Sequence, residues 1–303
     1  MEALRKGLTG SFPSMIALAG LLALAGCDAG GAENRAALGA AEASPPAESV
    51  GRAGAGPREL VIRTFDYRFD APDTILAGPT TIRLVNDGPD FHHVWLVRLE
   101  EGRSAGELIE PLAAHGPLPS WAVAVGGPNT PGAPGEETVA AVDLEPGEYA
   151  LVCVIPGMQD GELHVAKGMI RPLTVVPSGE ARVLPEPDLV MTLDDYTYEL
   201  DRPITPGRHA IRVVNAAAQP HEVVVVRLEP GRTAMDFLAF LQKPEGAPPG
   251  KMIGGVTWLS RGESNVMMLD FEPGEYALLC FVPDEGDGRL HLEHGMIAQF
   301  RVG

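Results

Sequence analysis

Short apolar runs separated by turn-forming residues fill the chain from about residue 58 to residue 303. The runs are rich in Val, Ile, Leu and Thr, and the segments between them are rich in Gly, Pro, Asn and Asp. This pattern predicts β-strands. The predicted strands are 59–66, 80–86, 93–99, 137–143, 147–154 and 169–176, followed by 188–194, 208–215, 222–228, 264–271, 275–282 and 295–302.

The strand pattern is interrupted by two segments with helical character, 104–115 and 233–242. Many short strands with turn signals between them indicate an all-β fold in which two sheets pack face to face as a sandwich. We therefore expect a β-sandwich architecture with a short helix in each half of the chain.

The two halves of this pattern are copies of one another. The segment LEPGEYALVC (144–153) matches FEPGEYALLC (271–280) at an offset of 127 residues, and Asn86 matches Asn215 at an offset of 129. Such a match indicates an internal duplication. It predicts two tandem domains, 58–178 and 179–303.

The N-terminal segment is typical of an export signal. Arg5 and Lys6 precede an apolar run that is too short to span a membrane, and the run ends in LALAGC with Cys27 last. This ending resembles the lipobox of bacterial lipoproteins, which implies a signal peptide at 1–26 and a lipid on Cys27. An ordinary secretory signal or a weak anchor is the alternative. Residues 27–57 lack apolar periodicity and are predicted to be a flexible tether.

That reading places the protein in a bacterial cell envelope, lipid-anchored at the periplasmic or extracytoplasmic face of a membrane. The chain is acidic, with a formal net charge of −18 and no basic cluster. Nucleic-acid binding is therefore not expected, because phosphate contacts need a basic surface. The acidic surface is expected to be a solvated one, although it would also suit a cationic partner.

The chain contains only three cysteines. Exported proteins usually pair their cysteines, but Cys153 and Cys280 occupy equivalent places in the two repeats and are expected to lie too far apart for a disulfide. Two unpaired thiols outside the cytoplasm need another explanation, and a metal provides one.

Each repeat carries the donors for one metal site. Two imidazoles, a thiolate and a thioether suit copper, whereas zinc is not expected with a methionine ligand. In each repeat ten residues separate the cysteine from the following histidine, and four separate that histidine from the methionine. The candidate ligands are His92, Cys153, His164 and Met169 in the first repeat, and His221, Cys280, His291 and Met296 in the second.

This order of residues resembles the cupredoxin, or blue-copper, family. The resemblance rests on the asparagine turn before the first histidine and on the run CVIPGMQDGELHVAKGM (153–169), which is similar to the type 1 copper loop of copper nitrite reductases. It implies two tandem Greek-key β-sandwiches, each with one type 1 copper held by two histidines and a cysteine, with an axial methionine. The spacing between cysteine and histidine is longer here than in most members.

The duplication helps to choose among neighbouring donors. Glu222 follows His221 in the second repeat, so His92 is a better ligand candidate than His93. Met158 has no counterpart in the second repeat, whereas Met169 and Met296 both follow a glycine. We therefore expect Met169 and Met296 to be the axial donors.

Several functions fit these sites. A membrane-tethered carrier that transfers one electron by the Cu(I)/Cu(II) couple to a redox partner protein is the leading hypothesis. Copper storage or delivery, and a structural or sensory module without functional copper, are the alternatives. An oxidase or nitrite reductase is disfavoured because the chain has no H-x-H motif. We therefore expect no enzymatic activity.

Overall fold

The computed structural model describes residues 55–303. The predicted signal peptide, Cys27 and nearly all of the predicted tether lie outside this range. Within it, strands dominate and two sheets contain all of the strands, so the all-β prediction is confirmed. No helix among the described residues is long and apolar enough to cross a membrane.

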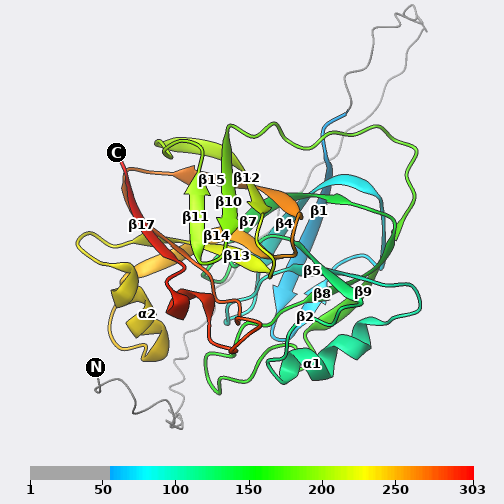
Figure 1. Cartoon of the computed structure of the whole chain (residues 1–303), viewed down its shortest axis with the longest axis horizontal. Coiled ribbons are helices and arrows are strands. Elements are labelled where there is room, and N and C mark those ends of the chain that lie inside the picture. Colours follow the sequence, from blue (N-terminus) through cyan, green and yellow to red (C-terminus); the bar gives the residue numbers. More distant parts are fainter. Residues whose placement is uncertain (1–54) are drawn as a thin grey trace, which may run out of the picture. The chain divides into compact units, whose positions relative to one another are not determined.

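The first sheet runs through both repeats. Figure 1 shows the first repeat in blue to green beside the second repeat in yellow-green to red. The order across this sheet is β11 (Thr197–Leu200), β10 (Leu189–Asp194), β12 (Gly207–Asn215), β15 (Ser264–Phe271), β7 (Glu137–Leu144), β4 (Gly78–Asn86), β1 (Arg58–Phe65) and β2 (Arg68–Asp70).

The second sheet is also shared. It contains β8 and β16, the strands directly before the two candidate cysteines. Its order is β17 (Ile297–Val302), β16 (Gly274–Leu279), β13 (His221–Leu228), β14 (Gly250–Leu259), β6 (Ala122–Gly126), β5 (Trp95–Leu99), β8 (Gly147–Val152), β9 (Ile170–Val176) and β3 (Thr74–Leu76).

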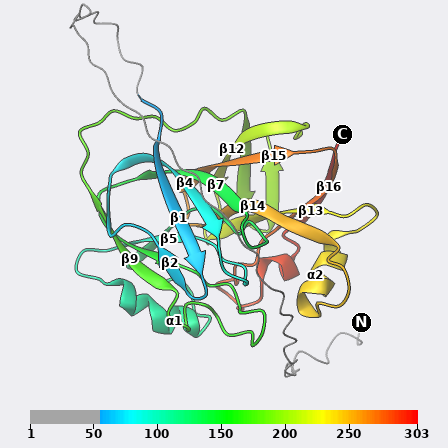
Figure 2. The same ribbon diagram turned by 180° about the vertical axis from the view of Figure 1, so that it is seen from behind.

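The repeats join through strand pairing in both sheets. In the first sheet β7 pairs antiparallel with β15, as the view from behind in Figure 2 shows, and in the second β6 pairs with β14. The backbone N–H of Asn129 donates to the Gly255 carbonyl at 3.1 Å, and the N–H of Thr257 donates to the Gly127 carbonyl at 3.0 Å. These reciprocal bonds relate equivalent positions of the two repeats.

Every strand predicted from the pattern coincides with an observed strand, but five observed strands were not predicted: β2, β3, β6, β11 and β14. Strand β14 contains the Gly254–Gly255 pair, which interrupts the alternation of side chains. Both glycines have a positive φ, of 125° and 132°. A Cβ at Gly255 would lie less than 3.0 Å from the carbonyl oxygen of Val223. Glycine is needed here because β13 and β14 approach so closely.

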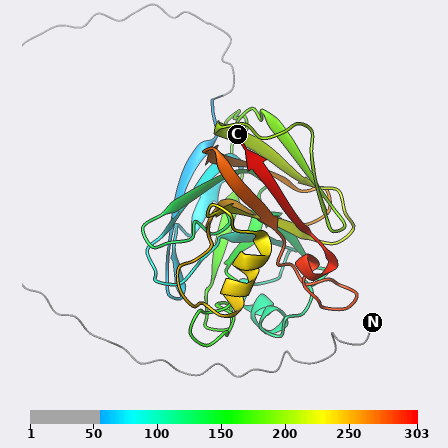
Figure 3. The same cartoon turned by 90° about the vertical axis from the view of Figure 1, so that its left-hand side faces the viewer.

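Both predicted helices are present. The first consists of a 3-10 turn, η1 (Ala105–Leu108), followed by α1 (Ile109–Ala113), and the second is α2 (Ala234–Gln242). The hydroxyl of Thr233 accepts from the backbone N–H of Asp236, while the Asp236 carboxylate accepts from that of Thr233, so α2 begins with a capping box. The N–H of Ala234 also donates to Gln299 of β17, and Figure 3 shows α2 beside that strand.

The buried apolar side chains come from one side of each strand, and some of them join the two repeats. Inward residues alternate with outward ones along the strands, as in β10, where Leu189, Met191 and Leu193 are buried. One cluster of buried side chains draws on both repeats and contains Trp95 and Trp258, whose ring centroids lie 4.6 Å apart. The two repeats are therefore joined by packing as well as by backbone hydrogen bonds.

Candidate metal centre

The structure brings three of the four candidate ligands of the first repeat into one group. A nitrogen or sulfur atom from each of His92, Cys153 and His164 lies within 4.8 Å of the others, and all three residues are buried. The Nδ1 atoms of the two histidines are 3.2 Å apart, and the Cys153 Sγ lies 3.5 Å from the Nδ1 of His164.

Hydrogen bonds to the backbone position these side chains. Asn86 ends β4, and its side-chain amide donates to the Asp90 carbonyl at 2.8 Å, which fixes the turn before His92. Cys153 directly follows β8. Its N–H donates to the carbonyl of Met169 at 3.2 Å, and the N–H of Met169 donates to that of His164 at 2.9 Å. Cysteine, histidine and methionine are thus joined in one small network.

The long spacing between cysteine and histidine has a local explanation. Residues 156–163 leave the site and return to it, because Pro156 and Leu163 form an antiparallel bridge and the His164 N–H donates to the Ile155 carbonyl at 3.0 Å. The second repeat closes its loop in the same way, through a bridge between Pro283 and Leu290. The extra residues therefore do not separate the histidine from the cysteine.

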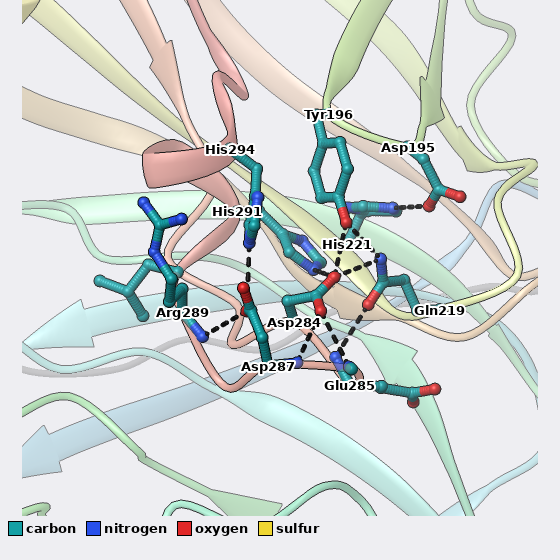
Figure 4. A network of polar contacts seen from close by, with 12 residues as sticks. Asp195, Tyr196, Gln219, His221, Asp284, Glu285, Asp287, Arg289, His291 and His294 are labelled. Carbon is teal, nitrogen blue, oxygen red and sulfur yellow. Dashed lines mark hydrogen bonds and ion pairs between the residues drawn. The ribbon is translucent and has the colours of Figure 1, made fainter. Parts of the chain in front are cut away.

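The second group repeats the first. His221, Cys280 and His291 are buried and lie within the same 4.8 Å limit. The Cys280 Sγ is 3.4 Å from the Nδ1 of His291 and 4.0 Å from that of His221. His291 begins a 3-10 turn, η2 (His291–His294), and its carbonyl accepts from the N–H of Met296 at 3.0 Å. Figure 4 shows the two histidines with their polar neighbours.

Both candidate axial methionines are fully buried beside these groups. Met169 belongs to the same apolar cluster as Cys153, and Met296 to the same cluster as Cys280. Met158, by contrast, is 53% exposed.

Carboxylates behind the histidines were not predicted. Asp66 Oδ1 lies 2.7 Å from the Nε2 of His92, and Asp195 Oδ1 lies 3.1 Å from that of His221. Each carboxylate accepts the Nε2 proton and leaves the Nδ1 lone pair available within the donor group, an arrangement common among metal-binding histidines. The sequence did carry a signal, because the dipeptide Asp-Tyr recurs at the offset of 129 residues.

The tyrosines of these dipeptides contact the other histidine of each group. The Tyr67 ring lies 4.8 Å from that of His164, and the Tyr196 ring lies 5.4 Å from that of His291. The Tyr196 hydroxyl donates to Asp284 at 2.6 Å (Figure 4) and, together with a bond from Gln219, holds the pKa of that carboxyl far below its usual range. Asp284 therefore stays ionised near the His291 ring.

Burial sets the protonation of the groups. It raises the pKa of Cys153 to about 12 and that of Cys280 further, and it lowers the pKa of His164 and of His291 to about 4. Near neutral pH the imidazoles are uncharged and the thiols keep their protons. A metal cation that binds the sulfur there has to displace the thiol proton.

The donors fit a trigonal metal ion. Bond lengths of about 2.0 Å to nitrogen and about 2.3 Å to sulfur, at about 120° to one another, separate two nitrogens by about 3.5 Å and a nitrogen from a sulfur by about 3.7 Å. The observed separations of 3.2, 3.4, 3.5 and 4.0 Å lie close to these values.

Among the described residues, the Nε2 atoms of His164 and His291 have no hydrogen-bond partner, although Asp90 lies 3.4 Å from the first and Asp284 lies 4.0 Å from the second.

Three of the other histidines form hydrogen bonds outside the two donor groups. The Nε2 of His93 accepts from the N–H of Val154 at 3.1 Å, His209 bonds to Asp188, and His294 bonds to Asp287. Among residues 55–303, no additional histidine joins either set of donors. The equivalent of His93 in the second repeat is Glu222, which is buried, and burial raises its pKa to about 7.

Comparison with known proteins gives distant likenesses. No family model and no curated protein matches the chain. Structural neighbours include a dithionite-reduced auracyanin from Roseiflexus castenholzii (20% identity, 38% of this chain, 94% of that chain, TM-score 0.27) and an azurin from Methylomonas (15%, 40%, 98%, 0.28). A copper nitrite reductase from Nitrosomonas europaea spans both repeats (13%, 81%, 93%, 0.23). With likenesses this distant, the assignment of copper rests on the donors themselves.

Proposed function

We propose that the protein is an extracytoplasmic electron carrier with two type 1 copper sites, tethered to a membrane by a lipid on Cys27. The proposal rests on the occurrence, twice in one chain, of a buried group of two imidazoles and a thiol beside a buried methionine. When bound, copper supplies a one-electron couple between Cu(I) and Cu(II). Eight residues hold it, namely His92, Cys153, His164 and Met169 at the first site, and His221, Cys280, His291 and Met296 at the second.

The protein residues have three tasks in this function. The buried side chains exclude water, and the backbone hydrogen bonds hold the donors in place before any metal arrives. Asp66 and Asp195 hold the Nε2 proton of one histidine in each site, which keeps Nδ1 free to coordinate. These tasks need no proton transfer to a substrate, and so we propose a carrier rather than an enzyme.

Copper stoichiometry and redox behaviour test this function. We expect residues 55–303 to bind two equivalents of copper and to be reduced and reoxidised reversibly at both sites. A storage or delivery protein would instead bind Cu(I) and release it without a reversible Cu(II) state. A module without functional copper would bind less than one equivalent.

The carboxylates behind the histidines provide a test of their own. Asp66→Asn replaces a charged acceptor with a neutral one, so His92 donates less electron density to Cu(II). We expect Cu(II) affinity at the first site to fall about 10- to 100-fold and its reduction potential to rise. Competition titration and potentiometry measure the two effects. Asp195→Asn is the matched variant for the second site, and an unchanged potential in both variants would contradict this role.

The membrane tether is tested in cells. Cys27→Ser should move the protein from the membrane fraction to the soluble exported fraction, because the thiol that carries the lipid is missing. Firm anchoring of the wild type requires more than one acyl chain, since a single chain binds only marginally. Membrane flotation measures the distribution. If the variant stays with the membrane, the proposal of a lipid anchor is wrong, and the proposal of the copper sites still stands.

A further inference from the structure

Three buried polar side chains lie between the two candidate metal sites and coordinate no metal in the proposed function. They are His93 and Asn129 from the first repeat and Glu222 from the second. Burying polar groups destabilises a protein unless they are hydrogen-bonded to one another or to the backbone. Their partners therefore indicate what this cluster, called here the polar bridge, does.

His93 and Glu222 hold equivalent positions. Each directly follows the first candidate histidine ligand of its repeat, and each accepts from the backbone amide that follows the cysteine. The Val154 N–H donates to the Nε2 of His93 at 3.1 Å, and the Phe281 N–H donates to Oε1 of Glu222 at 3.0 Å.

Asn129 connects these two residues across the junction of the repeats. Its Nδ2 donates to Oε2 of Glu222 at 3.1 Å. On the other side, the N–H of Val94, which follows His93, donates at 3.1 Å to the carbonyl of Pro128, which precedes Asn129. Because the Nε2 of His93 is already an acceptor, its Nδ1 carries the proton. Asn129 is fixed in this orientation, since its Oδ1 also accepts from the Thr130 N–H at 2.9 Å.

A path of covalent bonds and hydrogen bonds thus connects one cysteine to the other. It runs from Cys153 through Val154 to the side chain of His93, and through the hydrogen bond between Val94 and Pro128 to Asn129. From Asn129 it continues through Glu222 and Phe281 to Cys280. From these contacts we infer that the polar bridge is the path along which an electron passes between the two copper sites. His93, Asn129 and Glu222 act here as positioning and coupling residues and not as ligands.

The transfer is balanced without a further reactant. The site that gives up the electron goes from Cu(I) to Cu(II), the site that receives it goes from Cu(II) to Cu(I), and no proton moves and no bond breaks. The inference rests on the proposed function, because without copper at both sites there is no electron to pass.

A second contact also spans the junction of the repeats. It joins the rings of Trp95 and Trp258 and provides a competing route for the electron.

Intramolecular electron transfer after pulse reduction of the two-copper protein tests the path. Glu222→Gln keeps an acceptor for Phe281 but places an amide donor opposite the amide donor of Asn129. We expect the rate that is independent of protein concentration to fall several-fold. Asn129→Asp alone places two carboxylates together and should slow transfer as well. The double variant Asn129→Asp/Glu222→Gln restores a donor and an acceptor, and should restore most of the rate.

Two control variants separate the bridge from a general effect of mutation at the junction. Thr257→Val changes the position equivalent to Asn129, where the hydroxyl bonds only to backbone carbonyls, and should leave the rate unchanged. Trp258→Phe tests the aromatic route. If Trp258→Phe slows transfer and neither bridge variant does, the inference is wrong.

A readout without metal keeps the test independent of copper loading. In the metal-free protein, the free energies of unfolding of the single and double variants form a cycle whose interaction energy should favour the matched pairs. A cycle with no interaction between positions 129 and 222 would overturn the bridge itself. A wild-type protein with no cysteine-dependent copper band would overturn the proposed function. Intact bands with unchanged transfer in both single variants would overturn the inference alone.

Discussion

Cys153→Ser is expected to abolish the visible charge-transfer absorption of the first copper site and to leave that of the second intact. The band arises because a thiolate bound to Cu(II) donates charge to the metal, and a serine hydroxyl cannot replace it. Cys280→Ser should remove the other contribution, and the double variant should be colourless. Absorption spectra of the Cu(II)-loaded proteins, with copper measured on the same samples, give the result.

A substitution outside both donor groups provides the control. His209→Ala changes a histidine that bonds to Asp188 and lies in neither donor group, so both contributions should remain. If the wild type binds less than one equivalent of copper and shows no band that depends on Cys153 or Cys280, the proposal of an electron carrier is wrong. The all-β fold would still stand, since it does not depend on the metal.

Gly255→Ala should destabilise the protein more than any surface substitution. The new Cβ would come closer than 3.0 Å to the Val223 carbonyl oxygen, on a backbone with φ of 132° that side chains rarely adopt. Strain and displacement of β13 should together cost about 4 kcal/mol or more of unfolding free energy. Since β13 begins at His221, copper binding at the second site should weaken as well. Denaturant unfolding of the metal-free protein measures the loss.

Gly262→Ala is the matched control for this substitution. Gly262 also has a positive φ, of 84°, but a Cβ there would meet no atom within 4 Å. Only the backbone conformation is penalised, at a cost of about 1–2 kcal/mol. Equal losses for the two variants would show that the close approach of β13 and β14 contributes nothing and that the backbone conformation accounts for both.

The duplication made the choice of site residues possible from the sequence. A single copy of FHHVW would have left His92 and His93 equivalent, but the second copy has Glu222 in the later position. In the structure, His93 accepts a hydrogen bond from the N–H of Val154. Asp66 and Asp195 show the limit of this reasoning, since their recurrence is visible but their approach to a histidine depends on the fold.

Among the strands that were missed, β14 shows a limit of the side-chain pattern. In β14 the Gly254–Gly255 pair carries no side chain that could reveal which face is buried. The pairing of β6 with β14, and of β7 with β15, joins residues more than a hundred positions apart, which no local pattern specifies. Continuous sheets across two repeats therefore could not be derived from the sequence.

Those continuous sheets give the chain a fixed internal spacing. From β16, which Cys280 follows, to β8, which Cys153 follows, the second sheet takes five steps, through β13, β14, β6 and β5. At about 4.8 Å a step this amounts to about 24 Å along the sheet. A flexible linker between separate domains would let that distance fluctuate with every encounter. Here it is set by backbone hydrogen bonds, so an electron exchanged between the sites would meet one distance, and its kinetics would follow a single exponential.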